Sequence, residues 1–230
     1  SADIILLKRD LDVLRTGVED GRRTFANTLK YISITTSANF GNMISMAVAA
    51  PLLPFLPLVA KQILLNNFLS DVPSMAISTD RVDPDRVSYP QRWDIAHVRR
   101  YMMVFGLLSS VFDLLTFAAL LLLFRAGEAI FQTTWFVVSL LTELGVVLIL
   151  RTQGPAWRSR PSDLLLWTTI AAALLALAIP FLGPGSRLFG FVPLSPVEMG
   201  TVVAIVTTYL VATEATKQWF FRAHRGAMPA

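Results

Sequence analysis

Residues 64–73 have the sequence Leu64-Leu65-Asn66-Asn67-Phe68-Leu69-Ser70-Asp71-Val72-Pro73, an apolar stretch with one carboxylate and a helix-breaking proline two residues after it. A charged side chain is costly at membrane depth, and irregular backbone persists there only where it faces protein or lines a cavity. Asp71 is therefore a candidate ion ligand. The alternative is a buried ion pair with Lys61, although a continuous helix would place the two residues about 15 Å apart.

The composition of the whole chain is typical of an integral membrane protein. Of the 230 residues, 54% are hydrophobic and only 16% are charged, and the mean hydropathy is +0.57. These values are too apolar for an ordinary soluble domain. The chain has no cysteine, and its two histidines, His97 and His224, are far apart, so neither a disulfide framework nor a zinc site is predicted.

A window of about 20 residues, the length that crosses the hydrocarbon core, predicts an all-α polytopic membrane protein with six transmembrane helices. The prolines at 51, 54 and 57 predict a tight external hairpin after the first span and a discontinuous second helix. The six predicted spans cover residues 31–51, 54–77, 101–124, 131–150, 163–182 and 197–219.

Most of the 20 basic residues fall on one side of this topology, so the positive-inside rule places both termini in the cytoplasm. The net charge of +4 then reflects topology and contact with the lipid bilayer, and no nucleic-acid partner is predicted. Residues 2–7 are expected to form a short cytoplasmic strand. Apolar residues recur at helical spacing from Leu11 to Leu29, which predicts an amphipathic helix running into the membrane.

Several blocks of sequence resemble the P-type cation-transporting ATPases, and most of all the magnesium-transporting class. Residues 2–7 and 17–32 are similar to the end of that family's phosphorylation domain and its stalk helix. Ser37 to Asn42 resembles its fifth membrane helix, and Asn67 to Pro73 its sixth. With Arg92-Trp93-Asp94 and the stretch from Phe131 to Gln153, the resemblance covers nearly the whole chain.

The resemblance implies that the six spans are the last six of ten membrane helices and that the chain, which opens on Ser1, is a fragment. By this resemblance, residues 1–30 would be the end of the phosphorylation domain and the stalk, and residues 31–77 the ion-site helix pair. Residues 78–100 would form a cytoplasmic connector, residues 101–219 a four-helix support region and residues 220–230 a tail. The partners would be the missing phosphorylation, nucleotide-binding and actuator domains and the first four membrane helices.

The sequence lacks the family's Asp-Lys-Thr-Gly, Thr-Gly-Glu and Gly-Asp-Gly-x-Asn-Asp motifs. We therefore expect no ATP hydrolysis by this chain alone, with ATP and its Mg²⁺ acting only through the missing domains. The connector contains Asp80, Asp83, Asp85 and Asp94 among five arginines. Arginine and proline occupy positions where a calcium-binding loop needs ligands and glycine, so a salt-bridged loop is predicted.

Magnesium binds oxygen ligands in an octahedron and keeps several of its waters, so one or two carboxylates suffice. Asp71 would supply charge, and neutral oxygens would come from Asn39, Asn42, Asn67 and Ser70. The resemblance adds that calcium pumps carry a glutamate where this chain has Asn42. The absence of that carboxylate here favours a hydrated magnesium ion. The alternative for Asn39 and Asn42 is hydrogen bonding to a neighbouring helix.

Four other acidic positions in the spans need separate explanations. Glu143 lies near the middle of the fourth span and either joins the metal site or pairs with Lys61. Asp113 is predicted to bond nearby serines, and Glu198 and Glu214 to reach water.

The function predicted from the sequence is magnesium import across the plasma membrane, the inner membrane of a bacterium, by a P-type pump of which this chain is the C-terminal transport half. A proton pump is the nearest alternative, because a single intramembrane aspartate can carry a proton, and a calcium pump is another. Outside this class, the chain could be a non-catalytic remnant that binds a partner or forms a passive cation pathway.

Overall fold

The computed structural model describes residues 10–88 and 90–225, and the regular structure in this part of the chain is all helical, without a strand. The strand expected at residues 2–7 lies outside the described residues. The helices are α1 (Leu11–Ala49), α2 (Ala60–Ala76), α3 (Pro84–Ser88), α4 (Ile95–Ala118), α5 (Glu128–Leu150), α6 (Asp163–Ala178), α7 (Gly183–Phe189) and α8 (Pro196–Arg225). Short 3₁₀ turns cover Ile77–Thr79, Ala156–Arg158 and Ile179–Phe181, and a π-helical turn at Ala119–Leu123 extends α4.

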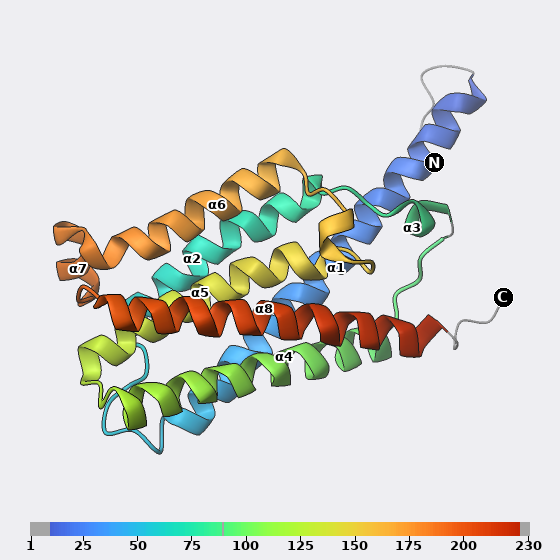
Figure 1. Cartoon of the computed structure of the whole chain (residues 1–230). Coiled ribbons are helices and arrows are strands. Elements are labelled where there is room, and N and C mark those ends of the chain that lie inside the picture. The colour runs from blue at the N-terminus through green and yellow to red at the C-terminus, as the bar shows by residue number, and fades with distance from the viewer. Residues whose placement is uncertain (1–9, 89, 226–230) are drawn as a thin grey trace.

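The six long helices form one bundle, and the N-terminal half of α1 projects beyond it (Figure 1). Helix α5 is the central element, since residues 131–140 along it are all buried. Its aromatic side chains hold the neighbouring helices. The rings of Trp135 and Phe117 meet edge to face at 4.7 Å, and Phe136 packs on Phe191 at 4.5 Å. The core therefore lies around α5, away from the lipid-facing sides of α4, α6 and α8.

Among the described residues, four helices are long and apolar enough to cross a membrane, namely Ile95–Leu123, Glu128–Leu150, Asp163–Phe181 and Pro196–Arg222. These agree with the last four predicted spans. Helices α1 and α2 are not apolar or long enough by the same measure. The second half of α1 contains several serine, threonine and asparagine residues, and α2 has only 17 residues with several polar side chains. The count of six membrane spans therefore stays a prediction for the first two.

The second predicted span differs in the structure. Residues 51–59 are non-helical, so α2 starts at Ala60 instead of residue 54. From there it continues through Pro73 to Ala76, and the prediction of a discontinuous helix was wrong. The prolines at 51, 54 and 57 do exclude helix before Ala60. Pro73 lacks an N–H, so it leaves the Leu69 carbonyl without an intrahelical donor but does not end the helix.

Helices α1 and α4 approach closely where two glycines face each other. A Cβ on Gly41 would lie 2.9 Å from the Gly106 carbonyl oxygen, and a Cβ on Gly106 would lie 2.7 Å from Cδ1 of Phe40. The Ser110 hydroxyl donates to the Gly41 carbonyl at 3.0 Å across the same contact. Small residues of this kind let membrane helices pack backbone to backbone. The contact fixes the position of α1 beside the bundle.

Replacing Gly41 with alanine should destabilise the protein by about 1–3 kcal/mol, because the added methyl group overlaps backbone that cannot move away. The measurement is thermal unfolding of the full-length protein in detergent. Gly200→Ala is the matched control, since a Cβ there meets nothing within 4 Å and alanine favours the helix. Equal melting temperatures for Gly41→Ala and Gly200→Ala would contradict the close-contact argument.

Candidate functional site

Glu143 of α5 lies at the centre of a polar cluster inside the bundle. A small cavity of about 20 Å³ beside it has room for one water molecule. Polar groups from four helices line this cavity: Ser37 and Asn42 of α1, Ser109 of α4, Ser139, Thr142 and Glu143 of α5, and Tyr209 of α8. The structure thus brings two sequence-predicted residues, Asn42 and Glu143, to one cavity.

Helix α2 meets the same carboxylate from the other side. The Asn66 amide donates to Oε2 of Glu143 at 3.3 Å, and Ser70, one turn further along, also interacts with Glu143. Asn66 and Ser70 are both buried. The Asn66 side-chain oxygen is buried without a hydrogen-bond partner among the described residues, which leaves it available as an acceptor or ligand. Sequence reasoning missed Asn66, although it directly precedes the predicted Asn67.

The remaining predicted ligands point away from this cluster. Asp71 and Asn67, four residues apart on one face of α2, are exposed, and so is Asn39 on α1. None of the described helices covers these three side chains. The predicted set therefore divides into an internal group, Asn42, Ser70 and Glu143, and an outward group, Asn39, Asn67 and Asp71.

Neither ion pair considered for Lys61 forms. Its ammonium group donates to the carbonyl of Leu188, near the end of α7, at 2.6 Å, while Glu143 is bonded by Asn66. The pairing of Lys61 with Glu143 was therefore wrong, and the pairing with Asp71 is likewise not seen. The reason is that Lys61 occupies the first turn of α2, at the far end from Asp71.

Asp113 has a structural role, as predicted, but with a different serine. Ser45 of α1 donates to its Oδ2 at 2.6 Å, and the Trp135 indole N–H donates to its Oδ1 at 3.0 Å. Ser110, the close neighbour in sequence, bonds backbone carbonyls instead. The buried carboxylate thus joins α1, α4 and α5 by two hydrogen bonds and needs no cation.

The two glutamates of α8 differ from each other. Glu198 is half-buried at the start of the helix, where its carboxylate accepts from the Ser195 N–H at 2.6 Å and caps the first turn. Glu214 pairs with Lys217 at 2.8 Å, with its side chain only 13% exposed. The prediction of a solvated Glu214 was wrong, because Lys217 is buried against the end of α5, where it also donates to the Ile149 carbonyl.

A buried charge cluster lies at the end of the bundle from which α1 projects. Asp80, just after α2, accepts from the Lys30 ammonium at 2.8 Å and from the Arg151 guanidinium at 3.2 Å, and all three side chains are at most 2% exposed. The Ser162 N–H donates to the same carboxylate at 3.2 Å. Burial lowers the pKa of Lys30, and the hydrogen bond and charge of Asp80 oppose that shift. The predicted salt-bridged connector is confirmed for Asp80.

The Asp80 cluster joins the connector to three helices. Asn27 and Lys30 of α1 also bind backbone carbonyls of Ser78, Asp80 and Arg81. Farther along, Asp83 accepts from the Thr152 hydroxyl and the Gln153 N–H beyond the end of α5. These contacts hold α1, the connector and the ends of α5 and α6 together as one unit.

Replacing Asp80 with alanine should cost about 3–5 kcal/mol of stability, since Lys30 and Arg151 would stay buried without their counter-charge. The free energy of unfolding of the full-length protein in detergent, from denaturant titration, is the measurement. Asp163→Ala removes an exposed carboxylate from the first turn of α6 and should cost about 1 kcal/mol or less. Similar losses for the two variants would refute the buried-cluster account.

The fold and its polar cluster define a class: a polytopic helical membrane protein with hydrogen-bonding and carboxylate side chains inside its helix bundle. Among the described residues, no three His, Cys, Asp or Glu side chains come together as a metal site. A cation held here would depend on single carboxylates with amide and hydroxyl oxygens.

Comparison with known proteins identifies the family. Residues 55–219 match the family described as cation transporting ATPase, C-terminus, and the chain belongs to it. It is 40% identical over 230 residues to a magnesium-transporting ATPase, P-type 1, of Escherichia coli K12, and equally so to one of Salmonella typhimurium LT2, covering 96% of this chain. A calcium-transporting ATPase of Bacillus subtilis is 24% identical over 92% of the chain.

The chain spans about a quarter of the length of these relatives, 25% in each case. It is the C-terminal membrane region of a P-type ATPase, and the resemblance to the magnesium-transporting class is confirmed.

Proposed function

We propose that this chain is the transport half of an ATP-driven pump that imports magnesium into the cytoplasm, with the ion site at Asp71. The observation that carries this proposal is the exposed carboxylate of Asp71 on α2, directly beside the buried residue Ser70 of the Glu143 cluster. A carboxylate facing lipid is costly, so this face needs a cover. The relatives named as magnesium-transporting ATPases support the choice of ion.

The outward group supplies the direct ligands in this proposal. Asp71 gives one charge, and Asn67 and Asn39 give amide oxygens, a set that suits a magnesium ion with several retained waters. The internal group acts behind it. Asn66 holds the Glu143 carboxylate, Ser70 lies between the two groups, and Asn42 faces the cavity that has room for one water. A calcium ion would call for more carboxylates than these helices offer.

The cover would come from the rest of the longer protein. The first four membrane helices would close over Asn39, Asn67 and Asp71, and the phosphorylation, nucleotide-binding and actuator domains would use ATP and Mg²⁺. Residues 1–30 would then end the phosphorylation domain and form the stalk, 31–77 the ion-site pair, 78–100 the connector, 101–219 the support region and 220–230 the tail. The hydropathy window supports six spans, and the positive-inside rule supports cytoplasmic termini.

Helix α1 provides the coupling. It is one helix of 39 residues, about 58 Å long, so a movement of its projecting end reaches Asn39 and Asn42 without a break. The Asp80 cluster ties the connector to α1 at Lys30, between that end and the site. Phosphorylation in the missing domain would shift α1 and the connector together and so change the affinity at Asp71. The membrane would be the plasma membrane, the inner membrane in a bacterium.

Asp71→Asn should lower magnesium-stimulated ATP turnover of the full-length protein in lipid by at least about tenfold, because the site loses its charge-assisted contact with the ion. The measurement titrates free magnesium, calcium and pH at fixed Mg-ATP. Asp163→Asn, an exposed acidic residue at the start of α6, is the control and should leave turnover unchanged.

The outcomes separate the alternatives. Turnover that follows pH and ignores free metal would replace magnesium with protons, and stimulation by calcium alone would indicate a calcium pump. No ATP turnover at all would support a non-catalytic remnant or passive pathway. Normal magnesium stimulation in Asp71→Asn would show that the site is elsewhere.

Asn66→Ala should raise the magnesium concentration for half-maximal turnover by about tenfold, since Glu143 loses its hydrogen-bond donor and its position. Asn66→Asp places a second carboxylate against Glu143 and should weaken magnesium binding further. Limited proteolysis with trypsin, or a measurement of the melting temperature, checks that both variants are folded. An unchanged half-maximal concentration in both would show that the internal group takes no part in ion binding.

A further inference from the structure

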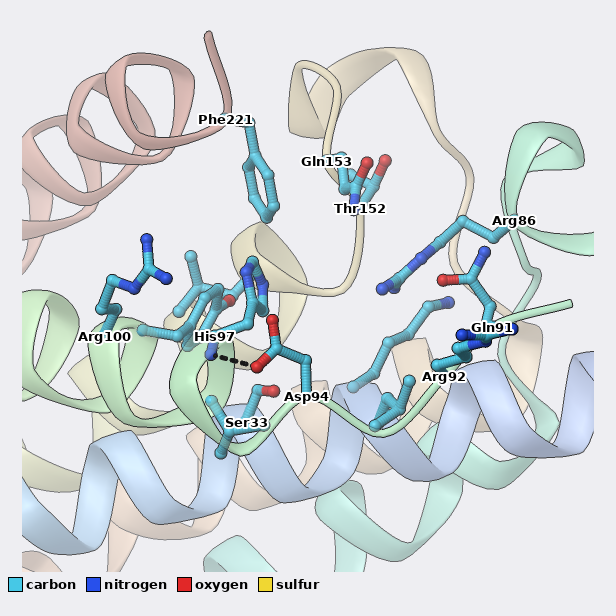
Figure 2. Close-up of a pocket in the computed structure, with 15 residues that line it drawn as sticks. Ser33, Arg86, Gln91, Arg92, Asp94, His97, Arg100, Thr152, Gln153 and Phe221 are labelled. Atoms are coloured by element: carbon cyan, nitrogen blue, oxygen red, sulfur yellow. Dashed lines mark hydrogen bonds between the residues drawn. The ribbon is translucent and has the colours of Figure 1, made fainter. Parts of the chain in front are cut away.

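A larger cavity lies at the end of the bundle near the Asp80 cluster, separate from Glu143. Its volume is about 330 Å³, at the lower end of the roughly 300–1,000 Å³ range of ligand pockets. Its walls come from α1, the connector, the start of α4 and the ends of α5 and α8 (Figure 2). The charged and imidazole side chains of its lining are those of Lys30, Arg86, Arg92, Asp94, His97 and Arg100.

The lining is strongly basic. Lys30, Arg86, Arg92 and Arg100 contribute four cationic groups, and Asp94 is the one acidic residue among the lining residues. Lys30 is paired with Asp80 behind the wall. Asp94 is also engaged, because its Oδ1 accepts from the N–H groups of Ala96 and His97 and so caps α4. Arg86 and Arg92 therefore meet little opposing charge among the described lining residues.

Arg86 is the most informative of these groups. Figure 2 shows its side chain pointing into the cavity, between α1 and the loop that carries Thr152 and Gln153. Its Nε is buried and has no hydrogen-bond partner among the described residues. Asp83 is near enough to interact with Arg86, yet its carboxylate accepts from Thr152 and Gln153. Burial lowers the pKa of Arg86 below its ordinary value, which is the signature of a cation without a full counter-charge.

A buried guanidinium N–H without an acceptor, as at Nε of Arg86, is costly, and an anion that supplies acceptor oxygens removes that cost. We propose that this cavity is a binding site for a phosphate group, held by Arg86 and Arg92, with Arg100 at its rim. The planar guanidinium donates two parallel N–H groups to phosphate oxygens, a geometry that a lysine does not provide.

The position of the cavity allows two sources of that phosphate. It lies where the membrane spans Ile95–Leu123 and Pro196–Arg222 have their ends, Val98 and Tyr101 on one and Phe221 on the other. The headgroup phosphates of membrane lipids lie at the level where membrane spans end. The oxygens of a soluble phosphate would fit the arginines equally well. A lipid headgroup and a soluble phosphate therefore offer the same contacts, and only a binding experiment with both separates them.

The test compares the full-length protein with the double variant Arg86→Gln/Arg92→Gln. The control variant is Arg99→Gln, an exposed arginine of the same α4 region that does not line the cavity. Native mass spectrometry measures retention of phosphatidylglycerol against phosphatidylcholine, and calorimetry measures binding of inorganic phosphate. Phosphate that binds elsewhere in the full-length protein contributes equally to the wild type and the double variant, so it does not affect the difference between them. Arg92→Gln alone, at an exposed position, provides a variant whose folding is not at risk.

We expect the double variant to bind phosphatidylglycerol at least about tenfold more weakly than the wild type, with Arg92→Gln weakened in the same direction and Arg99→Gln unchanged. If only inorganic phosphate shows this dependence, the site stands with a soluble phosphate as its ligand. If neither probe distinguishes wild type from the double variant, the proposal is overturned. This readout is binding, so it does not depend on magnesium transport.

Discussion

A carboxylate inside a membrane bundle has to be paired, hydrogen-bonded or covered, and this constraint organises the structure. Asp80 is neutralised by Lys30 and Arg151, Asp113 is held by Ser45 and Trp135, and Glu143 is held by Asn66. Each set of contacts joins α1 or α2 to the bundle around α5. Asp71 differs, because it is exposed and makes no hydrogen bond or ion pair to another described residue.

That difference separates structural from functional acids. Asp80 and Asp113 have their acceptor oxygens occupied by donors within the chain, so they stabilise helix packing. Glu143 lines a polar cavity and is bonded by Asn66, whereas Asp71 keeps both of its oxygens available on the exposed face of α2. Cation affinity is expected where carboxylate oxygens remain free, at the face of α2 between the bundle and whatever covers it. By the same reasoning, anion affinity is expected at Arg86, whose buried N–H lacks an acceptor among the described residues.

Much of the fold could be predicted from the sequence, because hydropathy and the spacing of apolar residues determine where long helices form. Four spans agree with the prediction, and α1 continues from the amphipathic segment into the bundle as expected. The start of α2 could not be predicted as well, since three prolines exclude helix but do not show where it resumes. Pro73 was expected to break the helix, but α2 continues through it. A proline near a helix end costs one hydrogen bond and need not end the helix.

Part of the polar cluster around Glu143 could be predicted from the sequence, and its role in ion binding stays a proposal. Asn42, Ser70 and Glu143 do gather around one cluster, but the sequence could not show that Asn66 holds Glu143, because which of two adjacent asparagines faces inward depends on the rotation of α2. The partners of Lys61 and Asp113 were missed for the same reason: each is a contact between helices, fixed by packing at places such as Gly41 and Gly106. The pairing of Glu214 with Lys217 lies within α8 and was missed because Lys217 is buried against the end of α5.

The central claim is that the exposed face of α2 at Asp71 is one wall of a magnesium site. A cryo-EM structure of the full-length protein in lipid with Mg²⁺ tests it directly. The account predicts that Asp71, Asn67 and Asn39 face other helices of the same protein and surround a hydrated ion, with Asn66 still bonded to Glu143. A structure in which Asp71 faces lipid, or in which the ion lies away from α2, would contradict it.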